Sequence, residues 1–160
     1  MSLPEQLGME LNNLEAQGAL VSPQQIAISG DNYQFVCELN ALGTLGCALS
    51  HMTVCGDKLA TASLDELKQV SELLASKLTY LLEPVATIEV DPEGCTVQMR
   101  SDPPHRERDG NVYYELLVRP GEVTLRRYRT EQRQPREAVA AHLTREVLVR
   151  LADDLVAVVC

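Results

Sequence analysis

The residues that decide the fold read SLDELKQVSELLASKLTYLLEP and span positions 63–84. They open with a capping box, because the Ser63 hydroxyl can accept a hydrogen bond from the Glu66 amide while the Glu66 carboxylate accepts one from the Ser63 amide. An apolar residue then recurs every third or fourth position, as in a helix with one buried face. The stripe consists of Leu64, Leu67, Val70, Leu74, Leu78 and Leu81, widened by Leu73 and Leu82. Pro84 ends the predicted helix after Glu83, and the stripe needs a second apolar layer to cover it.

That second layer is predicted from segments in which apolar and polar residues alternate, the pattern of half-buried strands. Such segments are 26–28, 33–39, 85–90, 95–99, 112–119 and 122–130, with turn residues at 30–32, 91–94 and 120–121. Residues 44–55 predict one more strand, although Gly46 weakens it and a helix ending at Gly56 is the alternative. Two further helices are predicted. The first spans 4–17 with Ser2 as its capping residue, and the last begins at the cap Thr144 and runs to about 157.

Together these elements predict an α+β fold in a single domain over residues 1–160. We expect one curved antiparallel sheet of about six to seven strands, with two long helices on one face and a short N-terminal helix within residues 1–18. Residues 101–110 are rich in proline and charge and predict a flexible loop. A strand–strand–helix unit occurs twice, around turns at Gly43 and Gly121, which raises the hypothesis of an internal duplication.

The composition is that of an ordinary globular domain. The 160 residues carry a formal charge of −9, are 45% hydrophobic and include five cysteines. No stretch approaches the roughly 18 apolar residues that predict a membrane span, and the first 11 residues lack the cation and apolar run of a signal peptide. An odd number of cysteines argues against a disulfide scaffold. We therefore expect a cytoplasmic protein with free thiols and no membrane partner.

Charge is distributed unevenly along the chain. Residues 1–99 carry 3 lysines and 13 acidic residues, whereas residues 100–160 carry 11 arginines and 10 acidic residues. In the strand 122–130, alternation places Arg126 and Tyr128 on one face, while Arg127 and Arg129 continue the other face beyond the part that can be buried. The predicted binding patch consists of Arg126, Arg127, Tyr128, Arg129 and Arg133.

We expect this arginine patch to bind carboxylates of a protein partner or of a second copy, because guanidinium groups pair with carboxylates through two parallel bonds. An anionic ligand such as a phosphate is the rival. Nucleic acid is not expected, because the chain is acidic, has only six aromatic residues and contains no recognisable nucleic-acid module.

The only cluster of soft metal ligands contains Cys37, Cys47, His51 and Cys55. On a helix the last three would share one face within reach of a zinc ion. On the predicted strand, residues four apart lie about 13 Å apart and cannot share a metal. We therefore expect buried thiols, no metal and no cofactor.

Catalytic signatures are weak in this sequence. His105, Glu107 and Asp109 alternate within the loop 101–110, but an exposed loop does not hold catalytic groups at hydrogen-bonding distance. No nucleophile motif or phosphate-binding glycine loop occurs. We expect no catalytic residues, and the alternative is a small-molecule binder or enzyme with a pocket between sheet and helices.

The order helix, three strands, helix, further strands, helix, in a small acidic chain, resembles in outline the small acidic chaperones that dimerise and hold secretion substrates. The resemblance implies a non-enzymatic protein-binding or scaffolding domain. The residues themselves predict a homodimer, because Val36, Tyr113 and Leu117 lie opposite the main apolar sets of their strands. They would form an apolar patch for a second copy to cover.

Overall fold

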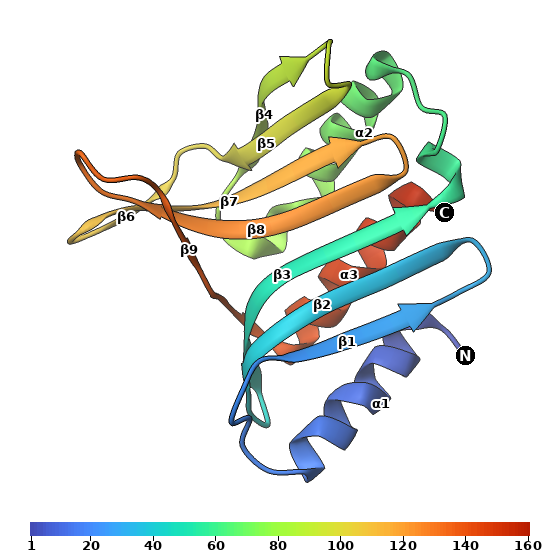
Figure 1. Ribbon diagram of the computed structural model, residues 1–160, viewed down its shortest axis with the longest axis vertical. Helices are drawn as coiled ribbons and strands as arrows, with labels where there is room; N and C mark the ends of the chain where they lie inside the picture. Colours follow the sequence, from blue (N-terminus) through green and yellow to red (C-terminus); the bar gives the residue numbers. More distant parts are fainter.

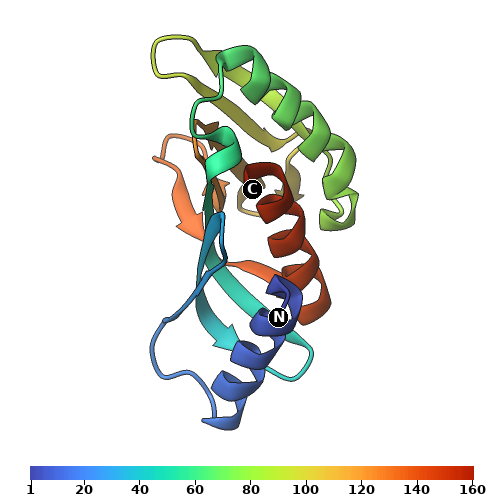
Figure 2. The same cartoon turned by 90° about the vertical axis from the view of Figure 1, so that its right-hand side faces the viewer.

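The computed structural model describes all 160 residues and has two layers, one sheet and three helices (Figure 1). The helices are α1 (Leu3–Ala16), α2 (Leu64–Lys77) and α3 (Arg145–Val159), with 3₁₀ turns η1 (Asp57–Leu59) and η2 (Leu78–Leu81). All three α-helices lie on the same side of the sheet (Figure 2). We call the opposite side the uncovered face. None of the helices is long and apolar enough to cross a membrane.

The sheet is antiparallel and has the strand order β1-β2-β3-β8-β7-β5-β4, with three short strands added beside this path. The main strands are β1 (Gln24–Ser29), β2 (Tyr33–Leu42), β3 (Gly46–Gly56), β4 (Val85–Asp91), β5 (Thr96–Ser101), β7 (Gly110–Arg119) and β8 (Glu122–Thr130). The short strands are β6 (His105–Glu107), β9 (Glu137–Val139) and β10 (Ala141–Thr144). The strand predicted over 44–55 is therefore confirmed, and the helical alternative is wrong.

The two central strands, β3 and β8, stay paired along only part of their length. Residues His51 to Cys55 of β3 pair with Glu122 to Arg126 of β8. Beyond this point β10 pairs with the start of β3, and β9 pairs with β8 from Arg127 to Arg129. The segment from β9 to β10 thus pairs with both central strands beyond the point where they separate (Figure 1). Because β3 and β8 separate here, Arg127 and Arg129 of β8 lie beside β9 instead of β3.

The predicted helix starts are confirmed by hydrogen bonds. In α2 the Glu66 amide donates to Ser63 Oγ at 3.2 Å and the Ser63 amide donates to Glu66 Oε1 at 3.3 Å. A second capping box at Ser2 opens α1. In α3 the Val147 amide donates to Thr144 Oγ at 3.1 Å. These bonds satisfy backbone donors that have no partner within the first turn of a helix.

Parts of the predicted architecture need correction. The helices contain 14, 14 and 15 residues, so α1 is as long as α2, and the expectation of two long helices and one short one is wrong. The sheet has ten strands rather than six or seven. The three additional strands have three or four residues each, too few for alternation to show in the sequence. One of them, β6, lies inside the segment 101–110 for which the sequence predicts a loop.

The end of α2 also differs from the prediction. The α-helix stops at Lys77 and continues as the 3₁₀ turn η2, after which Leu82 has a left-handed backbone with φ 66°. Leu82 is 91% exposed, so it does not widen the buried stripe. The left-handed residue reverses the chain before Pro84, which disfavours helical geometry at Glu83.

The core lies between the sheet and the helices. Phe35 and Met52 from the sheet and Leu67 and Leu148 from the helices are fully buried there. Helix α2 packs on β4, β5 and β7, whereas α3 packs mainly on β3. The helix of each strand–strand–helix unit therefore packs mainly on strands outside its own unit, and the internal duplication stays a hypothesis.

The substitution Leu82→Gly tests the backbone at the end of η2. A non-glycine residue in the left-handed region destabilises the folded chain by about 1–2 kcal/mol, and glycine removes this cost. Glycine also makes the unfolded chain more flexible, which offsets about 0.4–1 kcal/mol of the gain. Because the Leu82 side chain is exposed, the variant loses little packing, and we expect the free energy of unfolding in urea to rise by about 0.5–1 kcal/mol. As a control, Leu81→Gly removes a buried side chain and lowers it by about 3 kcal/mol. A less stable Leu82→Gly variant would contradict the expectation.

Candidate functional site on strand β8

The predicted arginine patch is divided between two faces by strand β8. Arg126 and Tyr128 lie on the uncovered face, opposite residues of β3 and β7, whereas Arg127 and Arg129 lie on the helix side. Arg133 lies in the turn between β8 and β9, exposed and with φ 63°. The alternation predicted from the sequence is confirmed. The five residues do not form one surface.

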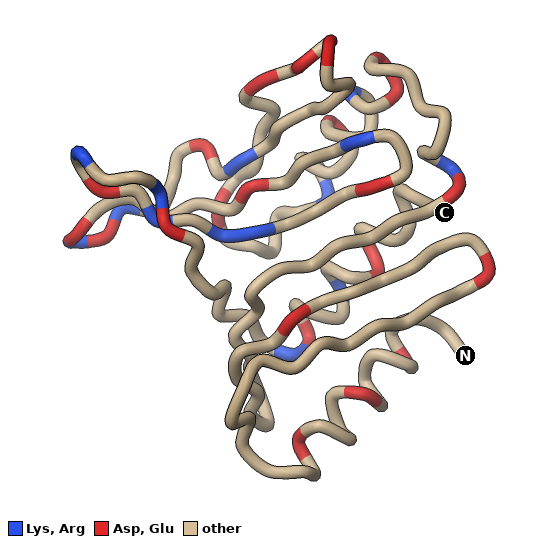
Figure 3. The backbone as a smooth tube through the Cα atoms, in the orientation of Figure 1, with Lys and Arg blue, Asp and Glu red and all other residues tan.

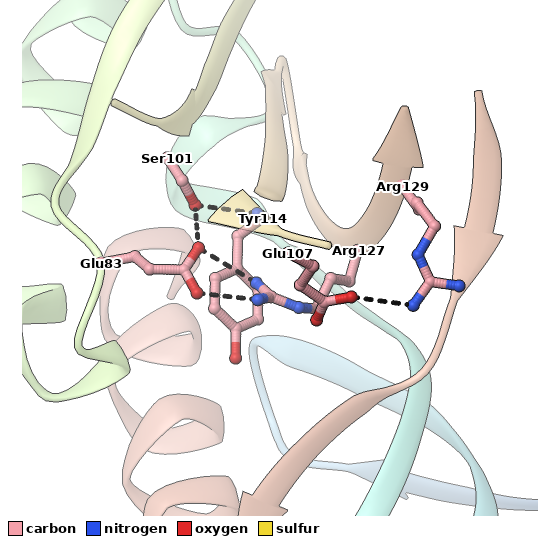
Figure 4. Close-up of polar contacts among 6 residues, drawn as sticks. All are labelled: Glu83, Ser101, Glu107, Tyr114, Arg127 and Arg129. Atoms are coloured by element: carbon pink, nitrogen blue, oxygen red, sulfur yellow. Dashed lines mark hydrogen bonds and ion pairs between the residues drawn. The ribbon is translucent and has the colours of Figure 1, made fainter. Parts of the chain in front are cut away.

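Arg127 forms the most buried ion pair of the molecule. Its Nη1 and Nη2 donate to the two carboxylate oxygens of Glu83 at 3.1 and 2.7 Å, and the two side chains are only 12% and 14% exposed. The guanidinium lies 4.2 Å from the centre of the Tyr114 ring (Figure 4). The expectation that Arg127 extends beyond the buried part of β8 is wrong, because Glu83 balances its charge inside the fold.

Ser101 connects this pair to the sheet. Its hydroxyl donates to Glu83 Oε1 at 2.8 Å and accepts from the Tyr114 amide at 2.9 Å. Burial raises the pKa of Tyr114, and the neighbouring Arg127 lowers it in part. The sequence analysis did not identify Glu83, Ser101 or Tyr114 as part of a site. A usable signal was present, since Glu83 is the single charged residue in the segment 78–85.

Arg129 forms a second, more exposed ion pair on the same side. Its Nη2 donates to Glu107 Oε2 at 3.1 Å, and the two side chains are 35% and 39% exposed (Figure 4). The Nε of Arg129 is buried and has no hydrogen-bond partner. Strand β6 positions Glu107, because it pairs with the start of β7 at the edge of the sheet.

A cavity of about 640 Å³ lies beside the two ion pairs. Its lining consists of Leu81, Leu82, Glu83, His105, Glu107, Val112, Tyr114, Arg127, Arg129, Val139, Ala140 and His142. Of the three alternating loop residues, His105 and Glu107 line this cavity, while Asp109 does not. The structure thus holds part of the segment 101–110 against a cavity wall.

On the uncovered face, Glu115 is the centre of a polar cluster. It is only 4% exposed and accepts hydrogen bonds from Gln98 Nε2 at 2.8 Å and Arg136 Nη1 at 2.6 Å. The bond to Glu115 raises the pKa of Arg136, whose guanidinium also lies 3.8 Å from the centre of the Tyr128 ring. The Tyr113 and Tyr128 rings lie 6.0 Å apart. Neither Glu115 nor Arg136 was part of the predicted patch.

Three other arginines of this face, Arg100, Arg119 and Arg126, form no ion pair. Beside them a row of small and apolar side chains crosses five strands through direct cross-strand pairs. The row consists of Ala27, Val36, Thr53, Thr124 and Leu117. Figure 3 shows the basic residues on the strands of the C-terminal half and few charges of either sign on β1 to β3. We call this row and the three arginines the open-face surface.

The four soft-ligand residues do not meet. Cys37 and Cys47 are buried, whereas His51 lies on the uncovered face opposite Glu38 and 3.9 Å from its carboxylate. No group of three or more His, Cys, Asp or Glu side chains is placed to hold a metal ion. Burial raises the pKa of the Cys37 thiol to about 12 and that of Cys47 to about 11.

Comparison of the chain with family models, with curated proteins and with solved structures finds no match. Its function is therefore inferred from the geometry of these two faces.

Glutamine in place of Glu83 tests the buried ion pair. The substitution leaves the Arg127 charge buried without compensation, and we expect the free energy of unfolding to fall by about 3 kcal/mol. The matched variant Glu107→Gln breaks the exposed pair and is expected to cost less than about 1 kcal/mol. Urea denaturation of both variants measures the difference, and equal losses would show that burial does not separate the two pairs.

Thiol labelling tests the burial of the cysteines. A thiol whose pKa is raised to about 12 or 11 stays protonated at pH 8.5, and only the thiolate reacts with iodoacetamide. We therefore expect Cys160, which is exposed, to be alkylated first, and Cys37 and Cys47 to react only after unfolding in urea. Peptide mapping by mass spectrometry gives the order, and early labelling of Cys37 in the folded protein would contradict it.

Proposed function

We propose that this protein is a non-enzymatic protein-binding or scaffolding domain and that the open-face surface is its binding site. The observation that carries the proposal is the position of Arg100, Arg119 and Arg126, which have no carboxylate partner. They lie beside a row of three apolar residues and two threonines that no element covers. Unpaired guanidinium groups favour a partner that supplies carboxylates. The apolar residues of the row favour a partner that also buries hydrocarbon.

The Glu115 cluster supports this use of the uncovered face. Its buried carboxylate is already satisfied by Gln98 and Arg136, so a partner does not have to pair a buried charge when it docks. The cluster also holds the Tyr113 and Tyr128 rings in place. The surface is therefore rigid before binding, which lowers the entropic cost of association.

A second copy of the chain is the partner to test first. Residues 1–99 carry 13 acidic residues against 3 lysines, so another copy supplies the carboxylates that the arginines lack. Val36 and Leu117 remain partly accessible on the uncovered face, as the homodimer prediction requires. Tyr113 does not contribute to the patch, because it is only 5% exposed, with the Arg100 guanidinium 5.4 Å from the centre of its ring and its hydroxyl bonded to Arg136.

Sedimentation velocity at about 100 μM, well above a micromolar dissociation constant, tests self-association. We expect a dimer for the unmodified protein and a monomer for Leu117→Lys, because the lysine places a charge in the apolar row. The control Leu73→Lys makes the same change at an exposed leucine of α2 in the helix layer and should leave the dimer intact. Arg126→Gln should weaken the dimer and reduce its salt dependence.

A monomeric unmodified protein under these conditions would exclude self-association. The wider proposal is then decided by a peptide of alternating glutamate and leucine, titrated by calorimetry. Binding that is lost in Leu117→Lys and kept in Leu73→Lys would support the open-face surface. Absence of both dimer and peptide binding would reject it.

A further inference from the structure

We propose that the cavity beside β6 and β9 binds a small organic carboxylate and that Arg129 is the residue that holds it. The cavity is lined by Arg127 and Arg129 on the helix side of the sheet, so this site is separate from the open-face surface and does not depend on its role. Its volume of about 640 Å³ is within the range of small-molecule sites.

The first argument is the incomplete bonding of Arg129. A guanidinium typically binds a carboxylate through two parallel N–H···O bonds. Glu107 accepts only one bond, from Nη2 at 3.1 Å, and leaves the buried Nε without an acceptor. A buried N–H without a partner is costly, so a second carboxylate oxygen at this position is favoured.

The second argument is the contrast between the two ion pairs. Arg127 is bonded to both oxygens of Glu83, and Ser101 donates to the same carboxylate, so this pair is complete and forms a fixed wall. Glu107 is 39% exposed and lies on a strand of three residues. Exposed ion pairs contribute little to stability. A ligand carboxylate can therefore replace Glu107 on Arg129, and Glu107 occupies its place when no ligand is bound.

The third argument concerns the rest of the ligand. Apolar side chains line the cavity beside Arg129, namely Leu81, Leu82, Val112, Val139 and Ala140. Leu82 has a left-handed backbone and is 91% exposed. The strained backbone costs free energy, and the exposed side chain gains no packing within the fold to offset it. An apolar group in the cavity would cover this side chain. The lining thus fits a carboxylate attached to a short hydrocarbon chain better than inorganic phosphate.

The test uses hexanoate, hexanamide and inorganic phosphate, each titrated into the full-length protein and followed by amide chemical shifts in NMR spectra. We expect hexanoate to shift resonances of β6, β8 and β9 and the other two probes to bind at least about tenfold more weakly, the loss of one charge-assisted interaction. Arg129→Gln should weaken hexanoate binding by a similar factor. Arg108→Gln, which removes an exposed arginine of the same segment without an ion pair, should not change it.

Glu107→Gln separates a ligand site from a structural role. It removes the competing carboxylate, so we expect hexanoate to bind about two- to fivefold more tightly, the value of one exposed ion pair. If Glu107 had only a structural role, Glu107→Gln would leave hexanoate binding unchanged or weaken it. Spectra without ligand confirm that each variant is folded. Unchanged binding in Arg129→Gln, unchanged or weaker binding in Glu107→Gln, or equal binding of hexanamide or phosphate would overturn the proposal.

Discussion

The rest of the structure depends on the ion pair between Glu83 and Arg127, which connects the end of the α2 segment to the sheet. Glu83 lies between η2 and β4, Arg127 lies on β8 at the point where this strand leaves β3, and Ser101 and Tyr114 add β5 and β7. Strands β5 and β8 thus bond directly to one carboxylate at the end of the α2 segment, and β7 is connected to it through Ser101. A charge of this kind is tolerated inside the fold only because each oxygen has a donor.

This pair lies on the helix side of the sheet, opposite the open-face surface. Successive side chains of β8 point to opposite sides of the sheet. The basic residues of this strand therefore lie in two different environments. On the helix side the arginines face carboxylates and a cavity. On the uncovered face Arg126 is free, while Arg136, from the connector after β8, covers the buried Glu115. The two proposed activities, protein binding and carboxylate binding, therefore use residues that are neighbours in sequence but lie on opposite faces.

Much of the secondary structure could be predicted from local patterns. Capping residues identified the starts of α1, α2 and α3, and alternation identified six of the seven main strands. The seventh, β3, was predicted as a strand with a helix as the alternative. The short strands β6, β9 and β10 could not be predicted, because they form only where a longer strand leaves backbone groups unpaired. The same reasoning placed Arg126, Arg127, Tyr128 and Arg129 on the correct faces of β8. It did not find that Glu83 pairs with Arg127 or that Arg136 lies over the Tyr128 ring.

Local sequence patterns predicted the side of the strand on which each residue lies, because capping and alternation are properties of the local backbone. They also predicted the type of each long element except residues 44–55, for which a helix remained the alternative. The pairing of the arginines depends on the tertiary structure. Glu83 and Arg127 are 44 positions apart, and they meet because β8 is placed between β3 and β7. Strand order is set by the packing of all elements together, so no local pattern encodes whether a given charge is free, paired or beside a cavity.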